Sequence, residues 1–321
     1  MHLNRGLLFW GLALVTAGAT ALAVQQGYID RDVVADAWRL WPVILIAIGL
    51  SIVLARTPFA VIGTLLAALI LGVGAGALVS VGPSVACTGD VPGGLATESG
   101  TFDGGTASVN LDFNCGDLNL AMADGAGWTA GTASDGSREI VVEAGGNSLD
   151  VHATDEEGWN WDGGKQRWDI SLGADLAYEL RLSANAADAD LDLAGGSFER
   201  LEIDPNAASL SIDLSGASVT DFDMAMNAGS AEIQTDAETA LAGRFTMNAG
   251  SFELCVPDTA ALRITVADSN FTFSHNLDSS GLTRSGDTWT SDAFDGADRF
   301  IDLRLEGNAA SFALNPDGGC S

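Results

Sequence analysis

The chain has 321 residues, a formal net charge of −29 and a single lysine, Lys165. This balance argues against nucleic-acid binding, because no basic stripe is available to contact phosphates, and against docking of the acidic region on anionic lipids. The chain is almost entirely apolar up to about residue 82 and rich in Gly, Ala, Ser, Thr, Asn and Asp from Thr88 onward. We therefore expect a membrane anchor, residues 1–82, followed by an acidic domain.

Three apolar runs make up the predicted anchor, at about residues 7–24, 38–55 and 59–81. As a helix, the first run would cover about 27 Å, close to the thickness of the hydrocarbon core of a bilayer. A cleaved signal peptide is the alternative for this run, but two more apolar runs follow instead of a soluble sequence. We predict a multi-pass bundle of about three transmembrane helices. The runs contain no Asp, Glu, Lys or His, which disfavours a transporter.

The orientation of the anchor is not decided by its arginines. Arg5 and Arg56 would lie on one side of the membrane and Arg31 and Arg39 on the other, which is a tie by the positive-inside rule. Four cysteines all follow the last apolar run, and cysteines that pair are typical of exported domains. We therefore expect the β-domain to be extracytoplasmic, after a linker at residues 83–94.

These four cysteines are Cys87, Cys115, Cys255 and Cys320. They allow two disulfides in three connectivities, of which we prefer Cys87–Cys115 with Cys255–Cys320. Thiols without a partner are the alternative. No C-x-x-C pair occurs and the three histidines are scattered, so we predict no metal site and no cofactor.

A repeat dominates the second half of the chain. Its core is an Asn-Ala-Gly-Ser-like motif that begins at Asn185, Asn206, Asn227 and Asn248, so the positions of consecutive asparagines differ by 21 each time. The motif returns at Asn308 and has a looser copy at Ala267-Asp268-Ser269. A fixed period near twenty predicts a solenoid.

The residues around the motif indicate strands. Apolar residues stand four and six places after each of the first four asparagines, with a polar residue between them, as in Leu210-Ser211-Ile212. Such alternation puts one face of a strand inward, and it extends back to Val109, Leu111 and Phe113. The predicted fold class is therefore the helical bundle plus an all-β, single-stranded β-solenoid with coils of about 21 residues. The solenoid would span residues 95–315, followed by a tail at 316–321.

Two features could carry contacts. The motif is expected to form the corners between strands, with Asn or Gly at positive φ and with stacked Asn side chains; an Asn ladder that binds ligand is the alternative. Trp159 and Trp161 interrupt the pattern in a glycine-flanked loop. They could contact a glycan or a partner, or fold onto the flank of the solenoid.

Acidic residues also recur at outward repeat positions, for example Asp190, Glu232 and Glu253. We expect solvated charge there, with weak stabilisation by divalent cations at most. Neither a basic cluster nor a triad motif accompanies these acids, so we predict no catalytic residues and no enzyme.

Two segments resemble known families. Arg5-Gly6-Leu7-Leu8-Phe9-Trp10-Gly11, Gly18 and the run Leu40-Trp41-Pro42 to Gly49-Leu50 resemble the membrane segment of LiaF- and LiaI-like envelope-response proteins. Val256-Pro257-Asp258, Leu262-Arg263-Ile264 and the Asn-Ala-Gly-Ser corners are similar to the toast-rack or adhesin-like β-solenoid domains that often follow such segments. The resemblance implies a cell-surface protein of the envelope stress response, or one that modulates a partner histidine kinase.

We therefore expect a non-enzymatic, membrane-anchored envelope protein that senses or modulates a stress response. Its partners would be the lipid bilayer and a sensor histidine kinase or another membrane protein. The alternative is a surface adhesin or scaffold that binds cell-wall glycan or self-associates through its solenoid.

Overall fold

The computed structural model divides the chain into two compact units, Met1–Val85 and Ala86–Ser321. It describes residues 11, 15–16, 87, 91, 93–136, 138–154, 164–267, 273–316 and 320. The fold described below is therefore that of the second unit, the β-domain.

The described part of the chain is nearly all β-structure, and no helix within it is long and apolar enough to cross a membrane. The predicted fold class is therefore wrong in its helical half, because the bundle of three transmembrane helices is not part of the described fold. Apart from Gly11, Val15 and Thr16, the predicted spans at 7–24, 38–55 and 59–81 lie outside the described residues. An apolar run meets the length requirement for crossing a bilayer, but it does not by itself establish a helix.

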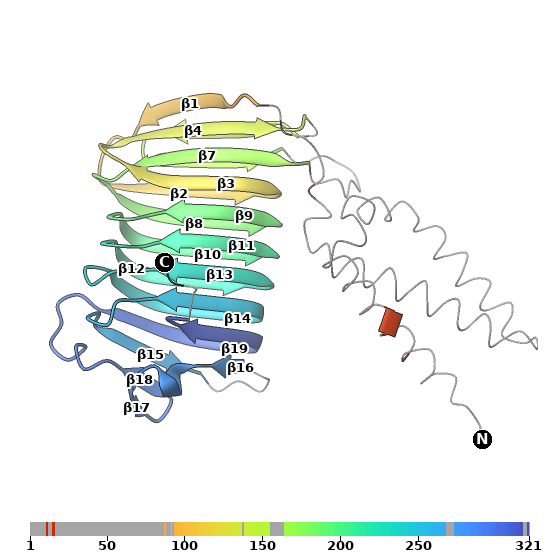
Figure 1. Ribbon diagram of the computed structural model, residues 1–321. Helices are drawn as coiled ribbons and strands as arrows, with labels where there is room; N and C mark the ends of the chain where they lie inside the picture. Colours follow the sequence, from red (N-terminus) through yellow and green to blue (C-terminus); the bar gives the residue numbers. More distant parts are fainter. Residues whose placement is uncertain are drawn as a thin grey trace, which may run out of the picture. The chain divides into compact units, whose positions relative to one another are not determined.

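The described strands belong to one sheet, which coils into a stack (Figure 1). In chain order they are β1 Ala96–Thr101, β2 Thr106–Phe113, β3 Gly116–Ala123, β4 Gly127–Ser134, β5 Ile140–Gly145, β6 Ser148–Ala153, β7 Gln166–Gly173, β8 Ala177–Asn185, β9 Ala187–Asp192, β10 Ser197–Asn206, β11 Ala208–Asp213, β12 Ser218–Met226, β13 Gly229–Gln234, β14 Ala240–Cys255, β15 Leu262–Val266, β16 Phe273–His275, β17 Thr283–Ser285, β18 Thr288–Thr290 and β19 Ile301–Leu314. A short 3₁₀ helix, η3, spans Leu277–Ser279.

Each regular coil consists of two strands, and consecutive coils pair in parallel with a 21-residue shift. In the first ladder, Leu182 of β8 pairs with Ile203 of β10, which pairs with Met224 of β12. In the second ladder, β9, β11 and β13 pair in the same way (Figure 1). The long strand β14 turns the corner and contributes to both ladders. The predicted β-solenoid, with its 21-residue coils, is thus present in this region.

The order of coils in space departs from the order in the chain at two places. The coil made by β2 and β3 lies between β6–β7 and β8–β9. The long strand β19 likewise lies between β14 on one side and β15 and β16 on the other. Near the two ends some pairs are antiparallel, namely β1–β4, β4–β7 and β5–β6 at one end and β15–β18 and β17–β18 at the other. The sequence period alone did not predict this order.

The core lies inside the coils and is built by the predicted alternation. In β9 and β11 every second residue is buried, and the buried positions include Leu191, Leu210 and Ile212. The inward residues Phe245 and Phe252 of β14 stack with ring centroids 3.9 Å apart. Burying a large apolar side chain is worth about 1.5–3 kcal/mol, so these inward positions hold the stack together.

Candidate functional site

An asparagine ladder runs along the corner between the two strand ladders. The side chain of Asn206 donates to Oδ1 of Asn185 at 3.0 Å, and Asn248 donates to Asn227 at 2.8 Å. Asn227 donates to Asn206. Asn308, far along the chain, donates to Asn248 at 2.8 Å because β19 is the neighbour of β14. All five predicted corner asparagines therefore stack side chain to side chain.

The ladder has one more member, Asn114, which accepts a hydrogen bond from Asn185 at 3.3 Å. It was missed because it lies 71 residues before Asn185 rather than at a multiple of 21. A signal was present, since Asn114-Cys115-Gly116 is followed by Leu118 and Leu120 in the spacing of the repeat. A search for the motif without its period would have found it.

The corners reach positive φ in two ways, and neither uses asparagine. In the corners after Asn185 and Asn206, Ala186 and Ala207 have φ of 47° and 55°. In the corners after Asn227 and Asn248 a glycine takes this role, as predicted, with φ of 132° at Gly229 and 128° at Gly250. The expectation of positive φ at Asn was wrong, because the Asn side chain is committed to the ladder while the next residues make the turn.

One outward side of the solenoid carries paired charges, and we call it the arginine face. It comprises the outward residues of β8, β10, β12, β15 and the first halves of β14 and β19. Its ion pairs are Arg181–Glu202 at 2.5 Å, Arg200–Asp221 at 2.7 Å, Arg304–Glu306 at 2.9 Å, Arg244–Asp223 and Arg263–Asp302. Most of these pairs link neighbouring coils, so acids and arginines largely neutralise each other on this face.

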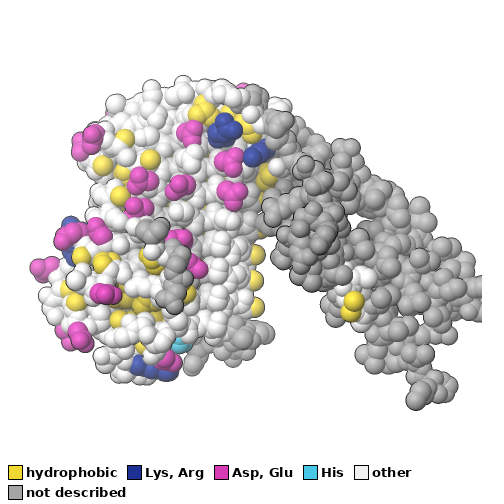
Figure 2. Space-filling model, in the orientation of Figure 1, with side chains coloured by type: hydrophobic (Ala, Val, Ile, Leu, Met, Phe, Trp, Pro, Cys, Tyr) yellow, Lys and Arg dark blue, Asp and Glu magenta, His cyan; other side chains and the backbone are white. Residues whose placement is uncertain are grey.

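The other outward side carries acids without arginines, and we call it the acidic face. It comprises the outward residues of β9, β11, β13 and the second half of β14. These residues are Asp188, Asp190, Asp192, Ser209, Ser211, Asp213, Ser230, Glu232, Gln234, Ser251 and Glu253. No ion pair within the described ranges involves them. Figure 2 shows acidic side chains spread over the visible surface of the β-domain.

A shallow groove of about 530 Å³ crosses the acidic face. Two rows of outward residues line it, each running from coil to coil. One row starts at Asp188 and continues through three serines, and the other starts at Asp190 and continues through one serine and two glutamates. On β3 it reaches Asp117, whose carboxylate lies 3.2 Å from Lys165 Nζ. The lining offers hydroxyl and carboxylate oxygens, which accept hydrogen bonds from a polar ligand.

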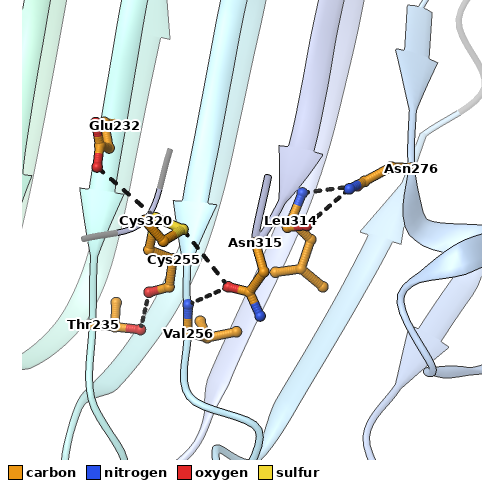
Figure 3. Close-up of a disulfide and its surroundings, with 8 residues drawn as sticks. All are labelled: Glu232, Thr235, Cys255, Val256, Asn276, Leu314, Asn315 and Cys320. Carbon is orange, nitrogen blue, oxygen red and sulfur yellow. Dashed lines mark hydrogen bonds between the residues drawn. A yellow bond between two sulfur atoms is a disulfide. The ribbon is translucent and has the colours of Figure 1, made fainter. Parts of the chain in front are cut away.

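The structure brings the cysteines together as Cys87–Cys115 and Cys255–Cys320. Cys115 is at the corner before β3, and Cys255 ends β14. Around the second disulfide, Oδ1 of Asn315 accepts from the backbone N–H of Val256 at 2.8 Å (Figure 3). Asn276 forms two 2.8 Å hydrogen bonds with the backbone of Leu314, one through each side-chain amide atom. The end of β19 is thus tied to both neighbouring segments.

The ion pairs of the arginine face raise the pKa of three of its arginines, and one tyrosine and two aspartates also have shifted pKa values. Burial raises the pKa of Tyr178 to about 12, against the effect of its hydrogen bond to Gly173. On the arginine face, burial and then the charge of Glu202 raise the pKa of Asp204. At the turn after β13, burial opposes ionisation of Asp236, but hydrogen bonds from Gly216, Thr239 and Glu238 lower its pKa below the usual value.

The remaining predicted contact residues, Trp159 and Trp161, lie outside the described residues. Over the described part of the chain, no group of three or more His, Cys, Asp or Glu side chains is arranged to hold a metal ion.

Family models match two parts of the chain. Residues 8–53 match the LiaI-LiaF-like transmembrane region, and residues 101–236 match the N-terminal domain of toast_rack. A search of curated proteins finds no match.

Solved structures that resemble the chain come from Clostridium and Parabacteroides species. A proposed cell adhesion protein from Clostridium sporogenes shares 11% identity over 68% of this chain and 98% of its own, with a TM-score of 0.47. A proposed adhesin from Parabacteroides distasonis shares 10% identity over 69% and 98%, with a TM-score of 0.26. A proposed lipid-binding protein from the same species shares 12% over 70% and 98%, with a TM-score of 0.25. At these values we draw no functional conclusion from them.

The resemblance predicted from the sequence is confirmed by the two family models. They fit a membrane-associated protein of the cell envelope. The chain combines a segment of the LiaI-LiaF-like transmembrane type with a β-domain of the toast-rack type.

Proposed function

We propose that this chain is a non-enzymatic envelope protein that senses or modulates a cell-envelope stress response through a partner membrane protein. The observation that carries the proposal is the joining, in one chain, of a LiaI-LiaF-like transmembrane region and a toast-rack domain. The N-terminal segment associates with the bilayer, and the partner is a sensor histidine kinase or another membrane protein.

The β-domain is extracytoplasmic in this proposal. Two disulfides in the β-domain support that location, since disulfides persist in oxidising compartments and are rare in the cytosol. The acidic face supports a role in contact rather than in folding, because the neighbouring arginine face has the same strand geometry although each of its five arginines is paired with an acid. A basic surface on the partner would be steered to the acidic face.

The test is a pull-down of the full chain from detergent-solubilised membranes, followed by identification of the bound proteins. Recovery of a sensor kinase, reduced in the variant D190K/E232K/E253K, is the expected result. The matched control, E179K/E202K/E306K on the arginine face, should retain the partner. A deletion strain with an unchanged response to wall-active antibiotics would count against stress sensing.

A second candidate function is a surface scaffold or adhesin that binds cell-wall glycan or self-associates. The groove on the acidic face supports it, because serine hydroxyls and carboxylates line a continuous track over several coils, and such groups hydrogen-bond to sugar hydroxyls. Co-sedimentation of the full chain in detergent with purified cell walls tests this function. Binding that S209A/S211A/S230A does not weaken would remove the groove as the site.

A further inference from the structure

The inward residues of the first ladder form an unbroken series at 21-residue spacing: Leu182, Ile203, Met224, Phe245 and Val266. The first four of these residues are direct neighbours on consecutive coils. The last two are not neighbours, since Leu305 of β19 pairs with Phe245 on one side and with Val266 on the other. The strand β19 therefore occupies a position between two segments that the repeat would make adjacent.

In the second ladder, too, β19 separates the last two members of a 21-residue series. The 21-residue series runs through Ile212, Ile233 and Leu254 to His275. In the structure, His275 pairs with Phe312 of β19, which pairs with Phe252 rather than with Leu254. Strand β16 is thus displaced by two residues from the repeat register. A shift of two residues keeps the same side chains facing inward, so the register of the repeat remains accessible to β16.

We propose that β19 is an insertable strand: it can leave its slot, whereupon β15 stacks directly on β14 in the 21-residue register. The Cys255–Cys320 disulfide holds the inserted arrangement. The sequence is compatible with both arrangements. Inward and outward residues alternate in β15 as they do in β14, and the inward residues of β15 follow those of β14 by 21 positions, just as Phe245 of β14 follows Met224 of β12. Parallel neighbours on either side allow β19 to be replaced without a change of strand direction.

A disulfide and several hydrogen bonds at the end of β19 hold the strand in the inserted arrangement. The disulfide joins Cys255, the last residue of β14, to Cys320 just beyond β19. The side-chain amide of Asn276 pairs with both backbone groups of Leu314, and Asn315 accepts from Val256 (Figure 3). These hydrogen bonds, like the backbone pairing of β19, can break and re-form, whereas the disulfide restrains the end of the strand covalently. A dithiol reductant opens it by transferring two electrons and two protons, which yields two thiols and the oxidised dithiol.

Cysteine trapping distinguishes the two arrangements in the full-length chain. Arg244, Arg304 and Thr265 point outward at one level of three adjacent strands. In the inserted arrangement Arg244 and Thr265 are two strands apart, about 10 Å, which is beyond the reach of a disulfide at about 7 Å. Once β15 stacks on β14, they become direct neighbours at about 4.8 Å.

The variant R244C/T265C is therefore made both with the native Cys255–Cys320 disulfide and with C255S/C320S. Mild oxidation followed by peptide mapping is expected to give the 244–265 bridge only in the C255S/C320S background. The matched pair R244C/R304C reports the inserted arrangement and should bridge when the native disulfide is kept. Absence of the 244–265 bridge in C255S/C320S overturns the proposal.

Hydrogen exchange supplies a second readout that needs no new cysteine. In C255S/C320S, amides of residues 301–314 should exchange about tenfold faster or more, while β8–β13 keep their protection. The control C87S/C115S lacks the other disulfide and should leave residues 301–314 protected. If 301–314 and β14 lose protection together in C255S/C320S, the end of the solenoid simply unfolds and the strand is not exchanged.

Discussion

The arginine face and the acidic face belong to the same backbone repeat and cover the same core, yet only the arginine face provides basic partners for its acids. On the first, arginines such as Arg181 and Arg244 meet acids on the adjacent coil. On the second, Asp188, Asp190, Glu232 and Glu253 have no basic partner among the described residues. Because both ladders form with the same 21-residue register, the register does not depend on the outward charges.

This difference indicates that the fold is determined by the inward residues of the strands and by the corners, not by the outward charges. Inward residues are apolar on both ladders, and outward acids occur on both, whereas outward arginines occur on one ladder only. Exposed ion pairs contribute little, typically about 0–1 kcal/mol, so the arginine face gains only modestly from its pairs. The acidic face therefore lacks such ion pairs at only a small cost in stability. Its outward residues can accordingly be ones that serve contacts with a partner.

The largest expected effect comes from an uncharged substitution at a corner, where the strand that leads into the acidic face begins. Gly229 begins β13 at φ 132°, and a Cβ there would lie 2.0 Å from the carbonyl oxygen of Ala208. Because the backbone must move and an alanine is strained at this φ, Gly229→Ala should lower the free energy of unfolding by about 3 kcal/mol. Chemical denaturation measures it. Gly145→Ala, where a Cβ meets nothing within 4 Å, is the control and should cost little; equal losses in both variants would contradict the argument.

The corner shared by the two faces should give the next effect. Asn227 both donates to Asn206 and accepts from Asn248, so Asn227→Ala removes two side-chain hydrogen bonds and should cost about 1–2 kcal/mol. Asn308 makes one such bond, to Asn248. The matched variant Asn308→Ala should therefore cost about half as much in the same thermal or chemical melt. A larger loss at Asn308 would show that the ladder is not the source.

The parts predictable from the sequence were those fixed by short-range pattern. Alternation identified the inward residues Leu191, Leu210 and Ile212, because a strand exposes every second side chain whatever its neighbours are. The 21-residue spacing identified which coils stack between β8 and β14, since equal coils place equal positions in register.

What could not be predicted depends on the whole stack. Strand β19 meets β14 at a sequence separation of 60, as at Asn308 and Asn248, and meets β15 at a separation of 39, as at Asp302 and Arg263. Neither interval is a multiple of 21, and Asn114 was missed for the same reason. The groove is likewise a property of the assembled face and has no local signal.

The corners show the same limit on a smaller scale. The positive φ at Ala186 and Ala207 was unexpected, because propensity favours Asn in that conformation. Only the side-chain ladder, which holds Asn185 and Asn206 in place, explains why the next residue makes the turn.

Charge reversal compares the two faces directly. Glu202 on the arginine face lies 2.5 Å from Arg181, so Glu202→Lys replaces attraction with repulsion and should cost about 1 kcal/mol. Glu232 on the acidic face pairs across the ladder with Ser211 and Glu253. There Glu232→Lys relieves repulsion and should change stability by no more than about 0.5 kcal/mol, in either direction. The two values should converge in high salt, and a cost at Glu232 as large as at Glu202 would remove the distinction between the faces.

The smallest effects should appear as opposite pH dependences of two acids. The pKa of Asp236 is lowered by its hydrogen bonds, so its ionised form stabilises the fold above the unfolded value of about 3.9 and this contribution is lost as pH falls through the folded pKa. Asp236→Asn should therefore destabilise at pH 7 and lose its effect at low pH. The pKa of Asp204 is raised by burial and by Glu202, so its ionisation opposes folding, and Asp204→Asn should be neutral or stabilising at pH 7 with no effect once the acid is protonated. Melting temperatures of the two variants from pH 3 to pH 7 should diverge from the wild type in opposite directions as pH rises; divergence in the same direction would mean that hydrogen bonding at the turn and burial on the arginine face do not control these carboxylates.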